Sequence, residues 1–333
     1  MQMRKIKYLL PLVLSVCCLA GCKDDNSDNN GGDNGSEISK TEGYYADYDL
    51  DLENAFLATE LQKMCFEKHK NYIPYSQYNS YCSKTSSGRN SIEAVADGSR
   101  TNQWFYTGKE ATGYGTREHV WPCANSAALW THSGSSTKDA HNVDYSAYIG
   151  GGSDLYHVRT AATKVNTARG NSKFVDFDDD EFADSRKDII EISENNGKYI
   201  LKTLGCDWNE KSKAYEYADK AEPADQMKGD VARIIVYVWV HYGSRGYVPE
   251  GSVKNGGMTF KKSDMCGSLS LTNIMGYESL DKCAQKLVEW NEIDPPSEVE
   301  KLRNTTVQKI QGNRNPFVDF PELMEQLFDQ YLD

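Results

Sequence analysis

The chain has 333 residues, a formal net charge of −12 and a hydrophobic fraction of 39%. Residues 45–333 contain neither a linker-like stretch nor a repeat with a period of tens of residues, which predicts one domain and excludes a repeat fold. Much of the negative charge falls in residues 23–53, which hold ten acids and two bases. The remaining body is mildly acidic, which argues against a protein that wraps a polyanion tightly but not against an enzyme that turns one over.

The N-terminus has the features of a bacterial export signal. Residues 1–21 begin with three basic side chains and continue with an apolar run, residues 9–19, that is too short to span a bilayer. The sequence Leu-Ala-Gly-Cys at residues 19–22 resembles a lipobox, which predicts removal of residues 1–21 as a lipoprotein signal peptide and lipidation of Cys22. A short membrane anchor that stays attached is the alternative.

Residues 22–44 are expected to form an acidic, disordered tether, since Asp, Asn, Gly and Ser dominate and almost no apolar side chain is present to be buried. Residues 23–25 (Lys-Asp-Asp) directly follow Cys22 and resemble the surface-export signal of bacterial lipoproteins, although an ordinary solvated linker has the same composition. We therefore expect an exported lipoprotein at the outer membrane or the cell surface.

A helix, a strand, a long loop, a second strand and another helix are predicted in the first half of the body. Residues 50–69 carry apolar side chains at helical spacing, whereas residues 71–110 are poor in helix formers and are expected to form loops and short turns. Residues 112–121 fit a strand that Pro122 stops. The polar stretch that follows is long enough to suggest a functional loop, and residues 154–160 and 161–169 fit a strand and a helix.

Beyond an acidic block at residues 176–184, expected to be a solvated loop, the chain is predicted to be helical from about residue 220. Residues 231–240 are apolar nearly all round, which fits a buried helix or a buried strand. An apolar stripe at helical spacing follows: Leu280, Cys283, Leu287 and Val288. Residues 297–300 fit a capping box that opens a helix running to Ile310, with Gly312 as its stop.

Six cysteines remain in the body of the chain: Cys65, Cys82, Cys123, Cys206, Cys266 and Cys283. No pair has the C-x-x-C spacing of a zinc knuckle, which argues against a structural zinc site. An even number of cysteines in an exported protein is compatible with disulfides. Because free cysteines are often simply buried thiols, both alternatives stay open.

The most informative stretch is residues 117–122 (Arg-Glu-His-Val-Trp-Pro). A carboxylate beside a histidine can supply a metal ligand and a proton acceptor from one short segment. The predicted helix downstream carries Asn166, Arg169 and Asn171 in an Asn-x-x-Arg-x-Asn pattern that could complete such a site. A lone His-Glu pair is more often a surface ion pair, so the two segments together carry the hypothesis.

Residues 117–122, 154–157 and 166–171 together resemble the endonuclease I family of secreted bacterial nucleases. Further stretches carry the same resemblance: residues 229–233, 287–291, 294–295, 303–304 and 311–317. The motifs occur in the family's order over roughly residues 45–330. Residues 158–162 depart from the Tyr-Pro-Thr-Asp-like run expected there, as does the loop between the strands, which puts substrate preference in doubt more than metal chemistry.

The resemblance implies an α+β, mainly helical fold in which a ββα-metal nuclease core is embedded in a single helix-rich domain, residues 45–333. It implies cleavage of DNA, and often RNA, without sequence preference. His119 would be the general base that activates a water. Glu118 and Asn166 would hold a single Mg²⁺, with Mn²⁺ or Ca²⁺ as substitutes, and Arg169 would lie near the phosphate or brace the site.

The chemistry of these residues agrees with those roles. A neutral imidazole can accept a proton at working pH, and Mg²⁺ keeps several waters, so one carboxylate and one amide oxygen are adequate anchors. Neighbouring strand residues point to opposite faces. Glu118 and His119 can therefore share one site only where the strand bends, which Pro122 allows.

Other polar and aromatic residues have more ordinary interpretations. His157 is expected to support the core, and Arg314 to act as a structural clamp rather than a phosphate ligand. Arg117 has no assigned role. Four aromatic residues could stack on bases, but such side chains are more often part of a core: Trp104, Phe105, Trp121 and Trp130.

The sequence thus predicts a lipid-anchored, Mg²⁺-dependent, non-specific endonuclease, acting as a monomer and held to the membrane through Cys22. One alternative is a surface lipoprotein that binds glycan or nucleic acid without catalysis, using its many Tyr and Trp residues. Another is an inactive nuclease fold that binds DNA without cutting it. A binding protein would tolerate His119→Ala and would need no metal.

Overall fold

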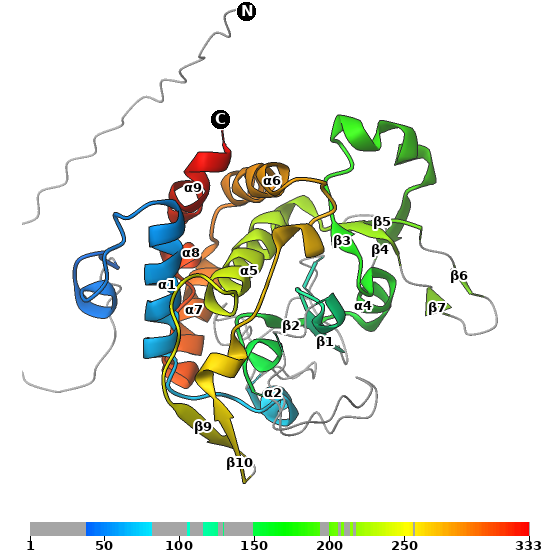
Figure 1. Cartoon of the computed structure of the whole chain (residues 1–333). Helices are drawn as coiled ribbons and strands as arrows, with labels where there is room; N and C mark the ends of the chain where they lie inside the picture. Colours follow the sequence, from blue (N-terminus) through cyan, green and yellow to red (C-terminus); the bar gives the residue numbers. More distant parts are fainter. Residues whose placement is uncertain are drawn as a thin grey trace, which may run out of the picture. The chain divides into compact units, whose positions relative to one another are not determined.

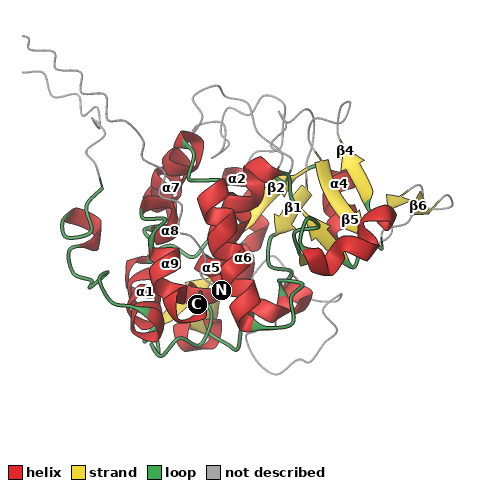
Figure 2. Cartoon of the chain, turned by 90° about the horizontal axis from the view of Figure 1, so that it is seen from above, coloured by secondary structure: helices red, strands yellow, loops and turns green. Residues whose placement is uncertain are grey.

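The computed structural model describes residues 38–81, 105–106, 116–125, 129, 149–193, 200–205, 208–209, 214–215, 218–255 and 257–332. These residues belong to one compact unit, Ile38–Asp333. Figure 2 shows its long helices gathered on one side and strands β1, β2, β4 and β5 on the other. The predicted α+β, mainly helical fold is confirmed. The predicted signal peptide and most of the predicted tether lie outside the described residues.

The centre of the helical side is α5 (Lys228–His241), in which every residue is buried. It packs between α1 (Asn54–Lys68) and α6 (Leu280–Ile293) (Figure 1). A helix satisfies its backbone hydrogen bonds internally, so a segment that is apolar all round can be buried among other helices. The helical alternative for residues 231–240 is therefore confirmed. No helix of the described chain is both long and apolar enough to cross a membrane.

The capping box at residues 297–300 is half confirmed. It opens α7 (Glu298–Gln311), where Ser297 Oγ accepts from the Glu300 backbone N–H at 3.2 Å, and Gly312 ends the helix with φ of +96°. The Glu300 carboxylate does not return to Ser297 but accepts from the Arg233 guanidinium. Two short helices follow, α8 (Pro316–Asp319) and α9 (Leu323–Phe328).

A strand pair and a helix carry the sequence motifs. Strand β1 (Thr116–His119) pairs antiparallel with β2 (Val158–Ala161), with Glu118 opposite Arg159, and α4 (Thr163–Arg169) follows. The second strand begins later than predicted because Asp154 closes a turn, accepting from the Tyr156 N–H at 2.7 Å. Residues 112–115 of the predicted first strand lie outside the described residues.

The remaining strands are short. One sheet has the order β3-β8-β5-β4, from Lys173–Phe174, Lys220–Glu222, Ile200–Leu204 and Ile190–Ser193. Two hairpins pair β6 (Trp208–Asn209) with β7 (Ala214–Tyr215), and β9 (Ser252–Asn255) with β10 (Met258–Lys261). The prediction of helix throughout the C-terminal part was wrong for β8 and for β9–β10, where an Asn-Gly-Gly sequence with Gly257 at φ +81° turns the chain.

Packing bears on three further expectations, for the acidic block, the cysteines and the aromatic residues. The acidic block is not simply solvated: Asp176 is buried against Lys228 at 3.0 Å, and Asp179 pairs with Lys286 at 2.7 Å. Four cysteines are free thiols: Cys65, Cys123, Cys266 and Cys283. Cys82 and Cys206 lie outside the described residues. Phe105 and Trp121 are core residues, whereas Trp104 and Trp130 are not among the described ones.

Candidate active site

Glu118 lies in β1, and its side chain points into the protein interior. Only 3% of the surface of the residue is exposed. Its Oε1 accepts hydrogen bonds from the Tyr106 hydroxyl at 2.5 Å and from Arg169 Nη1 at 2.9 Å. Burial raises the pKa of the Glu118 carboxyl to about 7, against the opposing effect of Arg169. Within the described part of the chain no hydrogen bond reaches Oε2. This second oxygen is therefore available to a cation.

Tyr106 supports the carboxylate from an unusual backbone conformation. Its φ of +73° is rare for a bulky side chain, and such conformations concentrate at functional sites. Its ring is fully buried and its backbone oxygen accepts from the Ala224 N–H at 3.1 Å. The surrounding core thus holds the hydroxyl against Glu118.

Asn166 is fixed against β1 through its amide nitrogen. Nδ2 donates to Thr116 Oγ1 at 2.8 Å and to the Arg117 backbone oxygen at 3.1 Å. A backbone carbonyl can only accept, so the amide orientation is determined and Oδ1 is the remaining polar atom. No hydrogen bond from a described residue reaches Oδ1, which leaves a second oxygen of the kind that hard cations bind.

Arg169 joins α4 to β1 from inside the protein. The residue is fully buried, and its guanidinium donates to the Glu118 carboxylate, to the His119 oxygen at 3.1 Å and to the Val120 oxygen at 2.6 Å. The same group lies over the Phe174 ring at 4.5 Å. Of the two roles expected for Arg169, these contacts favour bracing the site over touching a phosphate.

His119 is the last residue of β1, and its ring lies against the Gly152 oxygen, Tyr75 and His157. Nε2 lies 2.8 Å from the Gly152 oxygen; because that oxygen only accepts, Nε2 carries the hydrogen and Nδ1 the lone pair of the neutral ring. The ring stacks on Tyr75 at 5.4 Å and lies 5.6 Å from the His157 ring. Burial, reinforced by His157, lowers the pKa of His119 to about 3. The imidazole is therefore neutral over the whole physiological range.

Arg117, unassigned from the sequence, holds the outer side of this stack. Its guanidinium lies 3.9 Å from the Tyr75 ring centroid, and Nη1 donates to the Tyr75 backbone oxygen at 2.9 Å. Tyr75 is thus placed between Arg117 and His119. It belongs to a short 3-10 turn, Tyr75–Gln77, in a region without periodicity, so no pattern in the sequence indicated its role.

The turn Gly151–Ser153 orients both histidines of the strand pair. Its Gly152 oxygen receives His119, and its Gly151 oxygen accepts from His157 Nδ1 at 2.6 Å. His157 Nε2 in turn accepts from the Trp121 N–H at 2.9 Å. A Cβ on Gly151 would come within 2.8 Å of the Leu129 side chain. His157 is therefore the satisfied structural histidine that was predicted.

The expected site residues are held by two elements, and their side chains have different partners. Glu118 and Arg169 contact each other directly, while Asn166 contacts the first half of β1. His119 leaves the strand toward Gly152 and Tyr75, as the alternation of strand side chains implies. Among the described residues no hydrogen bond joins the side chains of Glu118, His119 and Asn166.

A polar pocket of about 500 Å³ opens beyond the C-terminal end of α4. It is lined by Asn125, Asn171, Ser172, Lys173, Ala218, Asp219 and Asn273. Asn125 follows the residue 117–122 motif and donates through Nδ2 to the Asn171 oxygen at 3.3 Å. The pocket therefore lies directly beside the segments that carry the candidate site.

Arg314 is the clamp that was predicted. It is buried, and its guanidinium donates to both carboxylate oxygens of Asp319, at 2.5 and 2.7 Å, and to Gln308 at 2.6 Å. These bonds tie the end of α7 to α8. The Arg314 guanidinium therefore binds to side chains within the helical side.

Comparison with known proteins agrees with this geometry. Residues 38–322 match the family described as Endonuclease I. The extracellular ribonuclease of Bacillus subtilis (strain 168) is 31% identical over 214 residues, which cover 64% of this chain and 53% of that protein. The extracellular ribonuclease of Bacillus amyloliquefaciens has the same identity and coverage, so the chain spans about half the length of these relatives. From this match, with the β1–β2–α4 element that carries the family's motifs, the chain belongs to the endonuclease I family.

Proposed function

We propose that the protein is a lipid-anchored, extracytoplasmic, Mg²⁺-dependent endonuclease that hydrolyses DNA phosphodiester bonds without sequence preference. The observation that carries the proposal is that Glu118 Oε2 and Asn166 Oδ1 accept no hydrogen bond from a described residue, while His119, on the same strand as Glu118, is neutral with its hydrogen on Nε2. RNA is the second candidate substrate, because the relatives are named as ribonucleases.

The donor set fits a hard cation. Glu118 and Asn166 offer one carboxylate and one amide oxygen, and both side chains are already fixed through their other polar atom. These residues would hold Mg²⁺, and Mn²⁺ or Ca²⁺ accepts the same oxygens. When bound, such an ion polarises the phosphoryl oxygen and neutralises charge on the leaving 3′-oxygen. Arg169 holds the carboxylate from behind through Oε1.

His119 would act as the general base through Nδ1. The Gly152 oxygen holds the Nε2 hydrogen, so Nδ1 is the nitrogen that would take a proton from water. The resulting hydroxide attacks phosphorus and the bond to the 3′-oxygen breaks. The 3′-oxygen takes a proton from solvent, and the other product carries a 5′-phosphate. The charge of a bound phosphate would raise the pKa of His119 from its low value toward neutrality. Tyr75 and Arg117 would keep the ring plane in place.

The membrane attachment rests on the sequence around Cys22. A monomer anchored there would face the extracytoplasmic side, which agrees with relatives named as extracellular. Fatty-acid labelling of cells that express the wild type and Cys22→Ala tests this part separately from catalysis. Equal labelling of the two proteins would exclude a lipid at Cys22.

Catalysis is tested with purified residues 38–333, the compact unit, on supercoiled plasmid DNA and on RNA. We expect cleavage with Mg²⁺, none with chelator, and loss of cleavage by about a hundredfold or more in His119→Ala. Glu298→Gln, an exposed carboxylate on α7, serves as the control and should cleave normally. Cleavage by His119→Ala at the wild-type rate would remove the proposed base. Failure of the wild type with every divalent ion tried would favour the binding lipoprotein.

A further inference from the structure

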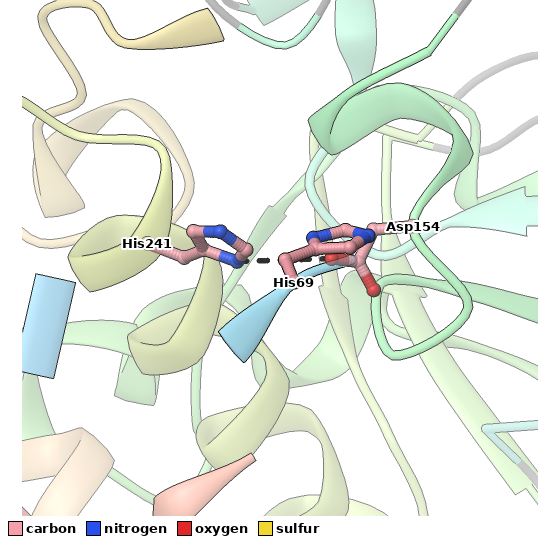
Figure 3. Close-up of side chains that lie close together, drawn as sticks. All are labelled: His69, Asp154 and His241. Atoms are coloured by element: carbon pink, nitrogen blue, oxygen red, sulfur yellow. Dashed lines mark ion pairs between the residues drawn. The ribbon is translucent and has the colours of Figure 1, made fainter. Parts of the chain in front are cut away.

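A second group of possible metal ligands lies away from Glu118 and Asn166. His69 follows the end of α1, Asp154 precedes β2, and His241 ends α5. One ligand atom from each lies within 4.8 Å of the others (Figure 3). The residues are at most 2% exposed, so water competes little for their polar atoms.

The hydrogen bonds of His69 leave one ring nitrogen with a lone pair. Nε2 lies 3.2 Å from the Asn71 backbone oxygen, so it must carry the hydrogen. Nδ1 is then unprotonated, and it is buried without a hydrogen-bond partner in the described structure.

His241 likewise has one ring nitrogen with a lone pair and no hydrogen-bond partner among the described residues. The Tyr237 and Tyr242 hydroxyls both donate to Asp154 Oδ2 at 2.7 Å, so the Tyr237 oxygen accepts from His241 Nδ1 at 2.8 Å. Nε2 is left as the unprotonated nitrogen, again buried and without a partner among the described residues. The Tyr72 hydroxyl, on a ring stacked 3.9 Å from His69, is a third such atom.

Buried polar atoms without partners are rare in folded proteins, and several in one place call for a missing ligand. Here two of them are ring nitrogens of His69 and His241, and the Asp154 carboxylate oxygen Oδ2 lies 3.8 Å from His241 Nδ1. Each ring also donates its other N–H to an oxygen, which is the arrangement that orients metal-binding histidines. Two imidazole nitrogens and a carboxylate oxygen match zinc far better than magnesium.

We propose that His69, Asp154 and His241 bind one transition-metal ion of the zinc type, at a structural site separate from the catalytic residues. Zinc-to-ligand distances of about 2.0–2.2 Å place tetrahedral ligands roughly 3.4 Å apart, so binding draws the three side chains closer together than they lie here. The ion joins α1, α5 and the segment that follows the Gly151–Ser153 turn. The cysteine spacing that argued against zinc does not bear on this site, because its ligands are histidines.

The test uses the untagged full chain in detergent, dialysed against Zn²⁺ and then against buffer. Elemental analysis should find one zinc per chain, and the zinc content should fall severalfold in His69→Ala and in His241→Ala. Thermal unfolding of the wild type should shift upward by several degrees with Zn²⁺ and return with chelator. Co²⁺ in place of Zn²⁺ should give the visible absorption of a tetrahedral site, which needs no variant to fold.

Glu118→Gln is the matched control, because it removes a buried carboxylate from the other site. It should keep its zinc while losing Mg²⁺-dependent cleavage. Loss of zinc in Glu118→Gln, or full zinc content in both histidine variants, would place the ion elsewhere and overturn the proposal. A wild type that neither retains zinc nor changes its thermal midpoint would likewise overturn the proposal. The readouts do not require nuclease activity, so this proposal and the proposed function can fail independently.

Discussion

Two fully buried arginines, Arg169 and Arg233, each face a buried glutamate, yet the two pairs are built differently. Arg233 meets Glu300 with two nitrogens on two oxygens, Nε to Oε1 at 2.8 Å and Nη2 to Oε2 at 2.6 Å. Arg169 meets Glu118 through Oε1 alone. Burial raises the pKa of both carboxyls above the ordinary value. The first pair is closed and can serve only the fold, whereas the second leaves an oxygen for another ligand.

The largest expected effect is a loss of activity when Glu118, but not Glu300, is substituted. Glu118→Gln keeps the shape of the side chain but removes the charge offered to a cation, so kcat should fall by about a hundredfold or more. Its thermal midpoint should fall as well, because Arg169 loses the charge of its buried partner, although the amide oxygen can still accept from Tyr106 and Arg169. Steady-state cleavage and thermal unfolding of the same sample measure both quantities. A Glu118→Gln protein with wild-type kcat would contradict the interpretation that Glu118 Oε2 binds the catalytic cation.

Glu300→Gln should lower stability but not activity. It leaves Arg233 buried without its full counter-charge, which costs about 3–5 kcal/mol of unfolding free energy. The kcat of the protein that remains folded should match the wild type, because Glu300 lies on α7 and contacts no candidate site residue. Urea unfolding supplies the free energies. A fall in kcat in Glu300→Gln as large as that in Glu118→Gln would mean that the two pairs are equivalent after all.

Tyr75 tests whether the open site also depends on its outer stack. Tyr75→Ala should lower kcat by about tenfold with little change in KM, because His119 loses the ring that fixes its plane. Tyr75→Phe keeps the stack and should restore most of the rate. If both variants cleave equally slowly, the hydroxyl rather than the stacking is responsible.

The smallest effect concerns pH and the closed network. Burial raises the pKa of Asp294, beside Arg233, from 3.8 to about 6. The folded state therefore holds this proton at pH values where the unfolded chain has lost it, so the contribution is present below about pH 4 and is lost as the pH rises through 6. Urea midpoints of wild type and Asp294→Asn across this range should show a steeper fall for the wild type. Parallel curves would rule out the shift.

The elements predicted best are those specified by local chemistry. Ser297 and Gly312 mark α7 because capping and a positive φ are properties of single positions. The residue 117–122 motif and Asn166 were found because their order along the chain is itself informative. The placement of Glu118 and Asn166 in one metal site and the role of His119 as the general base remain predictions.

What the sequence could not supply arises from tertiary packing. Tyr75 stacks on His119 although the two residues are far apart in the sequence, and no spacing rule predicts such a contact. His69 meets His241 only because α1 packs on α5. The choice between helix and strand for residues 231–240 likewise depended on what surrounds them. The β9–β10 hairpin was missed although its Asn-Gly-Gly turn signal is visible in the sequence.

Arg169 and Asn166 fasten α4 to the backbone of β1, at the Arg117, His119 and Val120 oxygens. These acceptors are backbone oxygens, which a residue offers whatever its side chain. A substitution at Arg117 or Val120 therefore leaves the attachment points of α4 in place. For protein engineering, the attachment of α4 to β1 can be kept while these two side chains are varied.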